Sequence, residues 1–127
     1  MRSHFILYVA DQEASTRFYS HVLDLDPILN VPGMTEFQLD RSAVLGLMPA
    51  SGISRLLGDK LPTPMVGAGS AMAEVYLLVE DPAAYHSRSI GGGGRELSAL
   101  QPRDWGHDVA YSMDADGYVL AFAQATK

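Results

Sequence analysis

Few residues of this chain could do chemistry. There is no cysteine, which removes thiol nucleophiles, disulfides and cysteine-ligated metal centres. Two titratable groups stand at the start of strand-length apolar runs: His4 before FILYV and Glu74 before VYLLV. Either could coordinate a metal or bind a ligand. For Glu74 the reason is that a carboxylate in an apolar setting needs a partner, or its pKa rises. His4 fits an exposed strand end as well as a position that hydrogen-bonds to a ligand or to Glu74, and Glu74 also fits a solvated strand start.

Aromatic and methionine side chains accompany these two groups. Tyr and Trp offer flat apolar area with one polar atom, and Met adapts to irregular shapes. Trp105 stands beside a glycine in a polar stretch, which favours the rim of a pocket, whereas Tyr111 fits a pocket and ordinary core packing equally well. No residue is assigned a catalytic role, and the candidate substrate-binding residues are His4, Tyr8, Met48, Glu74, Tyr76, Trp105 and Tyr111.

Other polar groups fit structural roles better. His21 and His86 fall on predicted helices, where we expect them to be exposed. Asp114 and Asp116 fall in a tight turn, where Asp supports the backbone geometry. The glycine run 91–94 follows a helix, whereas a phosphate-binding loop precedes one. These residues are therefore left out of the candidate site.

The elements that must position the candidates alternate between strand and helix. Residues 4–9 predict a strand, and Asp11 predicts the cap of a helix that ends near 23–26. The same order recurs with a strand over 74–79 and a helix over 82–90. The remaining predictions are a meander of strands over 27–49, an irregular segment over 49–71 with one helical turn at 54–57, a weak strand at 95–99, and a final hairpin over 107–124.

The chain contains an internal repeat. Shifted by 70 residues, FILYVAD at 5–11 falls on VYLLVED at 75–81; shifted by 75, VLGL at 44–47 falls on VLAF at 119–122. Two starts rich in Leu and Val can match by chance, but here the order of the elements matches as well. Each half has only one covered sheet face, so two halves must associate.

Strand alternation assigns the faces of the two predicted sheets. If Phe5, Leu7 and Val9 pack beneath the first helix, then His4, Ile6 and Tyr8 point the other way. The repeat extends this parity to both halves. The residues expected on the face away from the helices are His4, Tyr8, Gly46, Met48, Glu74, Tyr76 and Ala121.

Two motifs carry a resemblance to a known family. The opening runs from VAD at 9–11 to FYSHVLDL at 18–25, similar to V-x-D…S-x-x-F-Y…V-L-G-L, and the closing WGHDVAY at 105–111 and DADGY at 114–118 resemble W-G…A-Y/F-x-D-P-D-G-N. On these residues the chain resembles the glyoxalase, bleomycin resistance and extradiol dioxygenase superfamily, also called vicinal oxygen chelate. The resemblance implies paired βαβββ modules around a cleft and, at this chain length, a homodimer.

The resemblance also locates the positions of a family metal site. Metal-dependent members carry four ligands at repeat-related positions, which map here onto His4, Gly46, Glu74 and Ala121. Glycine and alanine cannot coordinate, so one histidine and one carboxylate remain. A catalytic metal normally needs about three protein ligands. We therefore expect no metal and no cofactor, unless a third residue such as His107 is recruited.

Composition excludes several classes of partner. Nine Lys and Arg against fifteen Asp and Glu give a net charge of −6, without any basic cluster, so nucleic acid and anionic membranes are disfavoured. No apolar run approaches the roughly 18 residues that a membrane span needs. The Met1-Arg2 start has no apolar segment behind it, and we expect a cytoplasmic protein.

We thus predict an α+β homodimer with one domain over 1–127: a first module over about 1–50, a loop over 49–71, and a second module over about 72–127. The preferred function is reversible binding of a cationic or aromatic small molecule, as in sequestration. The alternative is a metal-dependent lyase, isomerase or dioxygenase that uses His4 and Glu74 with waters or a third residue. A non-catalytic interaction module is a third class.

Overall fold

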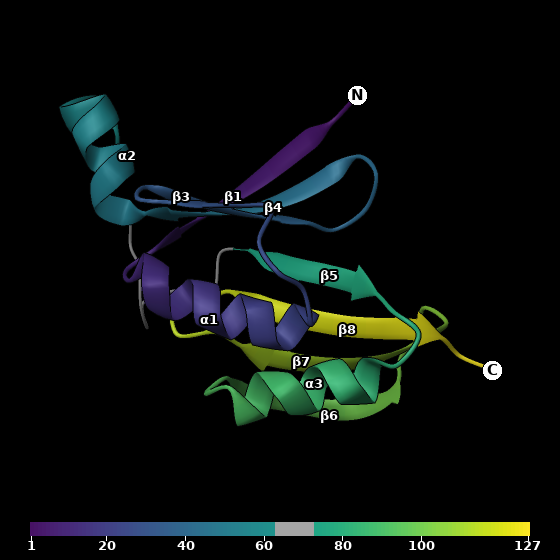
Figure 1. Ribbon diagram of the computed structural model, residues 1–127. Coiled ribbons are helices and arrows are strands. Elements are labelled where there is room, and N and C mark those ends of the chain that lie inside the picture. The colour runs from purple at the N-terminus through teal and green to yellow at the C-terminus, as the bar shows by residue number, and fades with distance from the viewer. Residues whose placement is uncertain (63–72) are drawn as a thin grey trace. The chain divides into compact units, whose positions relative to one another are not determined.

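The computed structural model describes residues 1–62 and 73–127, which form two compact units (Figure 1). The first unit holds four strands and the second holds another four; residues His21–Leu23, at the end of the first helix, group with the second unit. The elements of the first are β1 (Ser3–Val9), α1 (Gln12–Leu23), β2 (Leu29–Val31), β3 (Met34–Gln38), β4 (Ala43–Pro49), α2 (Ala50–Leu57) and the 3-10 helix η1 (Gly58–Lys60). Those of the second are β5 (Glu74–Leu78), α3 (Pro82–Gly91), β6 (Arg95–Pro102), β7 (His107–Met113) and β8 (Val119–Ala125).

The two sheets have the same topology. Their strand orders are β1-β4-β3-β2 and β5-β8-β7-β6, and in each sheet the first strand runs parallel to its neighbour while the other pairs are antiparallel. Each unit is thus a βαβββ module, and the α+β class with paired modules is confirmed. The assignment of residues 1–127 to a single domain stays a prediction.

The first sheet buries the face that the alternation predicts, and in its inner strand β4 the opposite face is also buried, at Val44 and Gly46. Leu7 and Val9 of β1 are buried, as are Leu45 and Leu47 of β4. Phe5 is an exception: it is 61% exposed, so the expectation that it packs beneath the helix is wrong. It lies near the outer end of an edge strand, and edge strands have a neighbour on one side only.

Helix α1 begins and ends at aspartates. The Asp11 carboxylate accepts the backbone N–H of Ala14, which satisfies one of the free donors of the first turn. The helix ends at Asp24, which adopts a left-handed conformation with φ 54° and donates its N–H to the Ser20 carbonyl. The hydroxyls of Thr16 and the fully buried Thr35 lie 2.8 Å apart and tie the helix to β3.

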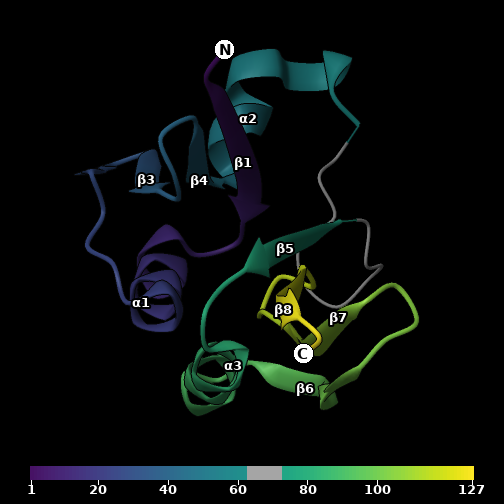
Figure 2. The ribbon, with the colours of Figure 1, turned by 90° about the vertical axis from the view of Figure 1, so that its right-hand side faces the viewer.

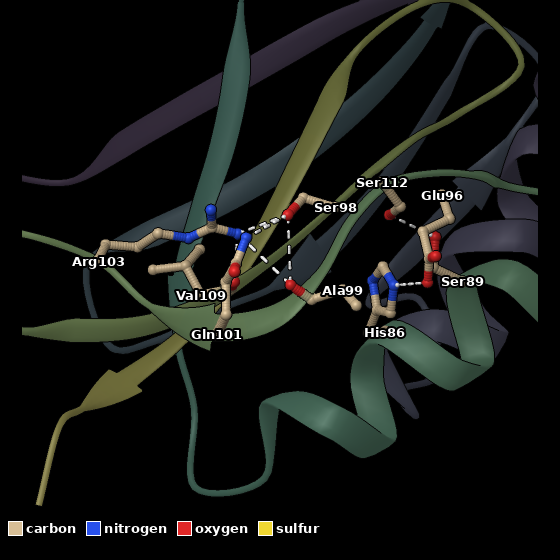
Figure 3. A network of polar contacts seen from close by, with 9 residues as sticks. All are labelled: His86, Ser89, Glu96, Ser98, Ala99, Gln101, Arg103, Val109 and Ser112. Carbon is tan, nitrogen blue, oxygen red and sulfur yellow. Dashed lines mark hydrogen bonds and ion pairs between the residues drawn. The ribbon is translucent and has the colours of Figure 1, made fainter.

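In the second unit, α3 lies against β6, β7 and β8 (Figure 2). The ring of Tyr85 packs on Phe122, and the buried hydroxyls of Ser89 and Ser112 form a hydrogen bond of 2.8 Å. His86 is also buried, and its Nε2 lies 2.8 Å from Glu96 (Figure 3). The expectation that His86 is exposed is therefore wrong, because the helix turns it toward the sheet.

The irregular segment contains more structure than its proline and glycine content suggests. Residues 50–57 form α2 where one turn was expected, and Ile53 is its buried residue. Within the rest of that segment, Gly58–Lys60 form η1, and residues 63–71 lie outside the described residues. The strand expected at 95–99 extends to Pro102. No helix in the described ranges combines the length and apolar character needed to cross a bilayer.

Candidate functional site

The second sheet carries an aromatic row on the face away from α3. In the strand register, Tyr76 of β5 and Tyr111 of β7 flank Ala121 of β8 on either side. Both rings pack against the buried cluster of Val109, Ala121 and Ala123. Small side chains on β8 and β7 thus form a floor between two phenol rings. We call this face, formed by Glu74, Tyr76, Tyr111, Ala121 and the turn residues described next, the aromatic face.

The turn between β6 and β7 adds Trp105 to the aromatic face. Its indole Nε1 donates a hydrogen bond of 3.0 Å to the Tyr76 hydroxyl, whose oxygen also lies 2.7 Å from Nδ1 of His107. An indole N–H can only donate, so the phenol oxygen is its acceptor. His107 Nδ1 then accepts a hydrogen bond from the Tyr76 hydroxyl or donates one to it, according to the imidazole tautomer. Trp105 is 52% exposed and yet held in one orientation.

Two charges of opposite sign act on Tyr111. Burial raises the pKa of the Tyr111 phenol above its ordinary value, and the negative charge of Glu74 raises it further. Arg103 opposes this shift, and its guanidinium carbon lies 5.1 Å from the centre of the Tyr111 ring. The phenol consequently stays protonated and neutral at physiological pH.

On the first sheet, three candidates lie on the face opposite Leu7 and Val9. His4, Ile6 and Tyr8 of β1 are in register with Val44, Gly46 and Met48 of β4. His4 Nδ1 lies 3.3 Å from a carboxylate oxygen of Glu36, which is in register with Gly46 from the other side. This pair gives the His4 imidazole a carboxylate partner within its own unit.

The two positions that cannot ligate a metal are closely packed. A β-carbon built on Gly46 would lie 3.1 Å from Ile6 Cγ1 and 3.2 Å from Met34 Sδ, closer than side chains ordinarily approach. Ala121 is fully buried between two tyrosines. Both positions supply packing, and the residues present do not fit the four-ligand set that the resemblance implies. Within residues 1–62 and 73–127, no three His, Asp or Glu side chains group closely enough to hold an ion.

The structure divides the seven candidates between the units. His4, Tyr8 and Met48 share one face of the first sheet, and Glu74, Tyr76 and Tyr111 share one face of the second, where Trp105 joins them. Sequence reasoning missed Arg103 of the aromatic face and Glu36 of the first sheet, and it named His107 only as a third residue to be recruited for holding a metal. His107 and Tyr111 are four residues apart on one strand, so alternation alone could have placed both side chains on the same face. The side chain of Arg103 folds back from a turn, where alternation does not apply.

The chain consists of two βαβββ modules. In each module the first strand pairs with the fourth, the fourth with the third and the third with the second, and this topology defines the class of protein. A family model, the Glyoxalase/Bleomycin resistance protein/Dioxygenase superfamily, matches residues 2–122, and the chain belongs to this superfamily. No curated protein matches the sequence.

Solved structures with similar folds share little sequence with the chain. A glyoxalase-related enzyme from Fulvimarina pelagi is 22% identical with a TM-score of 0.78, covering 98% of this chain and 87% of its own. A glyoxalase/bleomycin resistance protein/dioxygenase family enzyme from Burkholderia phytofirmans PsJN is 13% identical with a TM-score of 0.81, and 98% of each chain is covered. TioX from Micromonospora sp. ML1 is 16% identical with a TM-score of 0.71, and 99% of each chain is covered. These likenesses establish the fold.

Proposed function

We propose that the chain binds a small, partly aromatic organic molecule on the aromatic face of the second unit. One observation carries the proposal: Trp105 is half exposed, yet its indole is fixed by a hydrogen bond to Tyr76. An exposed ring that a hydrogen bond already orients offers apolar area at a reduced entropic cost on binding. Tyr76 and Tyr111 extend that area across the floor of small residues.

Glu74 favours a ligand with a cationic group. It starts β5 on the same face as Tyr76, is exposed, and makes no ion pair among the residues that the structure describes. Its charge reaches the site, since it contributes to the raised pKa of Tyr111. An ammonium group beside Glu74 would gain Coulomb attraction, and the phenol and indole faces would add cation–π attraction.

Binding is favoured over metal-dependent catalysis by the packing of Gly46 and Ala121. Both stand at positions where the resemblance expects ligands, and their surroundings leave little room for a coordinating side chain. We accordingly propose that the protein works without a cofactor, and that it is a homodimer, as the resemblance implies. Sedimentation velocity would test the dimer.

One observation supports the alternative of a metal-dependent lyase, isomerase or dioxygenase. His4 and Glu36 present an imidazole and a carboxylate at 3.3 Å, and such a pair can contribute two ligands. Elemental analysis of protein purified without chelators separates the two functions. A stoichiometric transition metal that is lost in His4→Ala would favour the enzyme.

The binding proposal is tested with neutral and cationic probes of the same shape, naphthamide and naphthylmethylammonium. Trp105 is the single tryptophan of the chain, so its indole N–H gives one isolated NMR signal that reports on the site. Both probes should shift this signal, and the cation should bind several-fold more tightly than the amide. Glu74→Gln should abolish the preference, whereas Glu80→Gln, at an exposed position beyond the end of β5, should keep it. An unmoved indole signal with both probes would refute the aromatic site, and an unchanged preference in Glu74→Gln would remove Glu74 from it.

A further inference from the structure

Arg103 places a positive charge on the aromatic face. It lies in the turn between β6 and β7, where its backbone N–H donates to the His107 carbonyl. Its side chain folds back over the sheet and stacks on the ring of Tyr111. Arg103 is half-buried, so its guanidinium is partly removed from water.

The internal contacts of Arg103 use only one of its three nitrogens. Nη2 donates to the Ser98 hydroxyl at 2.8 Å, to the Val109 carbonyl at 2.8 Å and to the Ala99 carbonyl at 3.4 Å. Figure 3 shows these contacts leaving from one end of the guanidinium, while the other terminal nitrogen points away from them. Nε is buried and has no acceptor among the residues that the structure describes.

All three acceptors are electrically neutral. In the part of the chain that the structure describes, ion pairs join His4 to Glu36, Arg17 to Glu13 and His86 to Glu96, and none involves Arg103. A partly desolvated cation without an anion is unfavourable, and the planar guanidinium fork matches a carboxylate.

A purely structural role accounts for only part of this arrangement. The register of β6 shifts between Glu96 and Ser98 and again between Ser98 and Gln101, so the ladder to β7 is interrupted there. Nη2 supplies donors to the carbonyls at this irregularity, on Ala99 and Val109. Bonding these carbonyls requires only Nη2. It does not explain why the side chain carries a second terminal nitrogen, Nη1, and a positive charge.

We infer that Arg103 binds a carboxylate of the ligand, so that the ligand is an aromatic zwitterion with its carboxylate at Arg103 and its ammonium at Glu74. This inference rests on the proposed function, because it specifies the ligand of the same face. Tyr111 relates the two charged groups to each other. The guanidinium of Arg103 lies over its ring, and the carboxylate of Glu74 acts on its hydroxyl.

The test uses a third probe of the same shape, naphthoate, beside the neutral naphthamide. In the unmodified protein naphthoate should bind about tenfold more tightly than naphthamide, the ratio expected for a charge-assisted hydrogen bond. The preference should disappear in Arg103→Gln and persist in part in Arg103→Lys, which keeps the charge but loses the fork. Arg95→Gln, which removes an exposed charge near the start of β6, should leave it unchanged.

The outcomes separate this inference from the proposal beneath it. If naphthamide shifts the Trp105 signal but naphthoate binds no better, the aromatic site stands and the role of Arg103 is refuted. If Arg103→Gln keeps the preference, another residue binds the carboxylate and the inference fails. If no probe moves the indole signal, the proposed function itself fails. Should Arg103→Gln not fold, the ratio in Arg103→Lys decides: an unreduced preference would contradict recognition by the guanidinium fork.

Discussion

Replacing Tyr76 by Phe tests the hydrogen-bonded group that orients the aromatic face. The substitution deletes one oxygen, which accepts from Trp105 Nε1 at 3.0 Å and lies 2.7 Å from His107 Nδ1. A typical internal hydrogen bond contributes about 0.5–1.5 kcal/mol net. Because Trp105 is 52% exposed, water can replace the acceptor that its indole loses. The stabilisation by the two bonds together should therefore lie in the lower part of twice that range. We expect Tyr76→Phe to reduce the free energy of unfolding by about 1–2 kcal/mol, which corresponds to a fall in Tm of about 4–8 °C.

The neighbouring strand provides a matched control. Tyr111 lies in the same cross-strand row, and the structure shows no hydrogen bond from its hydroxyl to any described residue. Tyr111→Phe therefore removes the same atom without breaking a bond, and should change the free energy of unfolding by less than about 0.5 kcal/mol. Urea unfolding followed by far-ultraviolet circular dichroism measures both variants, and the Trp105 indole signal should move only in Tyr76→Phe. Equal losses in the two variants, or an indole signal unmoved by Tyr76→Phe, would refute the assignment of Tyr76 as the anchor of Trp105.

Two further predictions concern the charge at Tyr111 and the packing at Gly46. Burial and then the charge of Glu74 raise the pKa of Tyr111 above 10.0, so the folded chain holds this proton more tightly than the unfolded chain does. The resulting contribution to stability is complete below the pKa of the unfolded chain and is lost as the pH rises through the pKa of the folded chain. Phenolate absorbance, with Tyr111→Phe as the reference, should show the Tyr111 pKa falling in Glu74→Gln and unchanged in Glu80→Gln; a pKa unmoved by Glu74→Gln would contradict the coupling. Gly46→Ala should lower the free energy of unfolding by about 1–3 kcal/mol, since its methyl group would meet Ile6 and Met34. The loss should be smaller in an Ile6→Ala background, and strictly additive losses in the double variant would refute a steric cause.

The fold was predictable because local and long-range signals agree in this sequence. Aspartate caps, apolar runs of strand length and a repeat of their order lead to two βαβββ modules, and both sheets have the predicted order of elements. The failures have a common physical origin. His86 and Phe5 were misplaced because periodicity does not say how far a neighbouring element extends over a residue. Residues 50–57 were read as mostly irregular because their neighbouring glycines and prolines masked a short helix, which buries Ile53.

The candidate site was predictable to the extent that strands position it. Alternation placed Glu74 and Tyr76 on one face, because in a regular strand a side chain's direction follows from its residue number. Tyr111 was a candidate by residue type alone, and the strand register puts it on the same face. Arg103 escaped this reasoning because it lies in a turn, and its side chain is positioned by three acceptors that meet only after β6 and β7 pair. Glu36 escaped because its partner His4 lies two strands away in the sheet, across β4.

Small residues stand at two positions where the resemblance implies metal ligands, and this affects what each sheet face can do. At Gly46 the missing side chain lets Ile6 and Met34 approach each other, and at Ala121 a methyl group lets two tyrosines lie on either side of one strand. A glutamate at position 121 would have to place a charge between those rings, where burial already raises the pKa of the Tyr111 phenol. The small side chain of Ala121 therefore belongs to the apolar floor against which Tyr76 and Tyr111 pack. A coordinating side chain at position 121 would compete for space with the packing of the two rings, which supports the proposed binding of a flat molecule over metal-dependent catalysis.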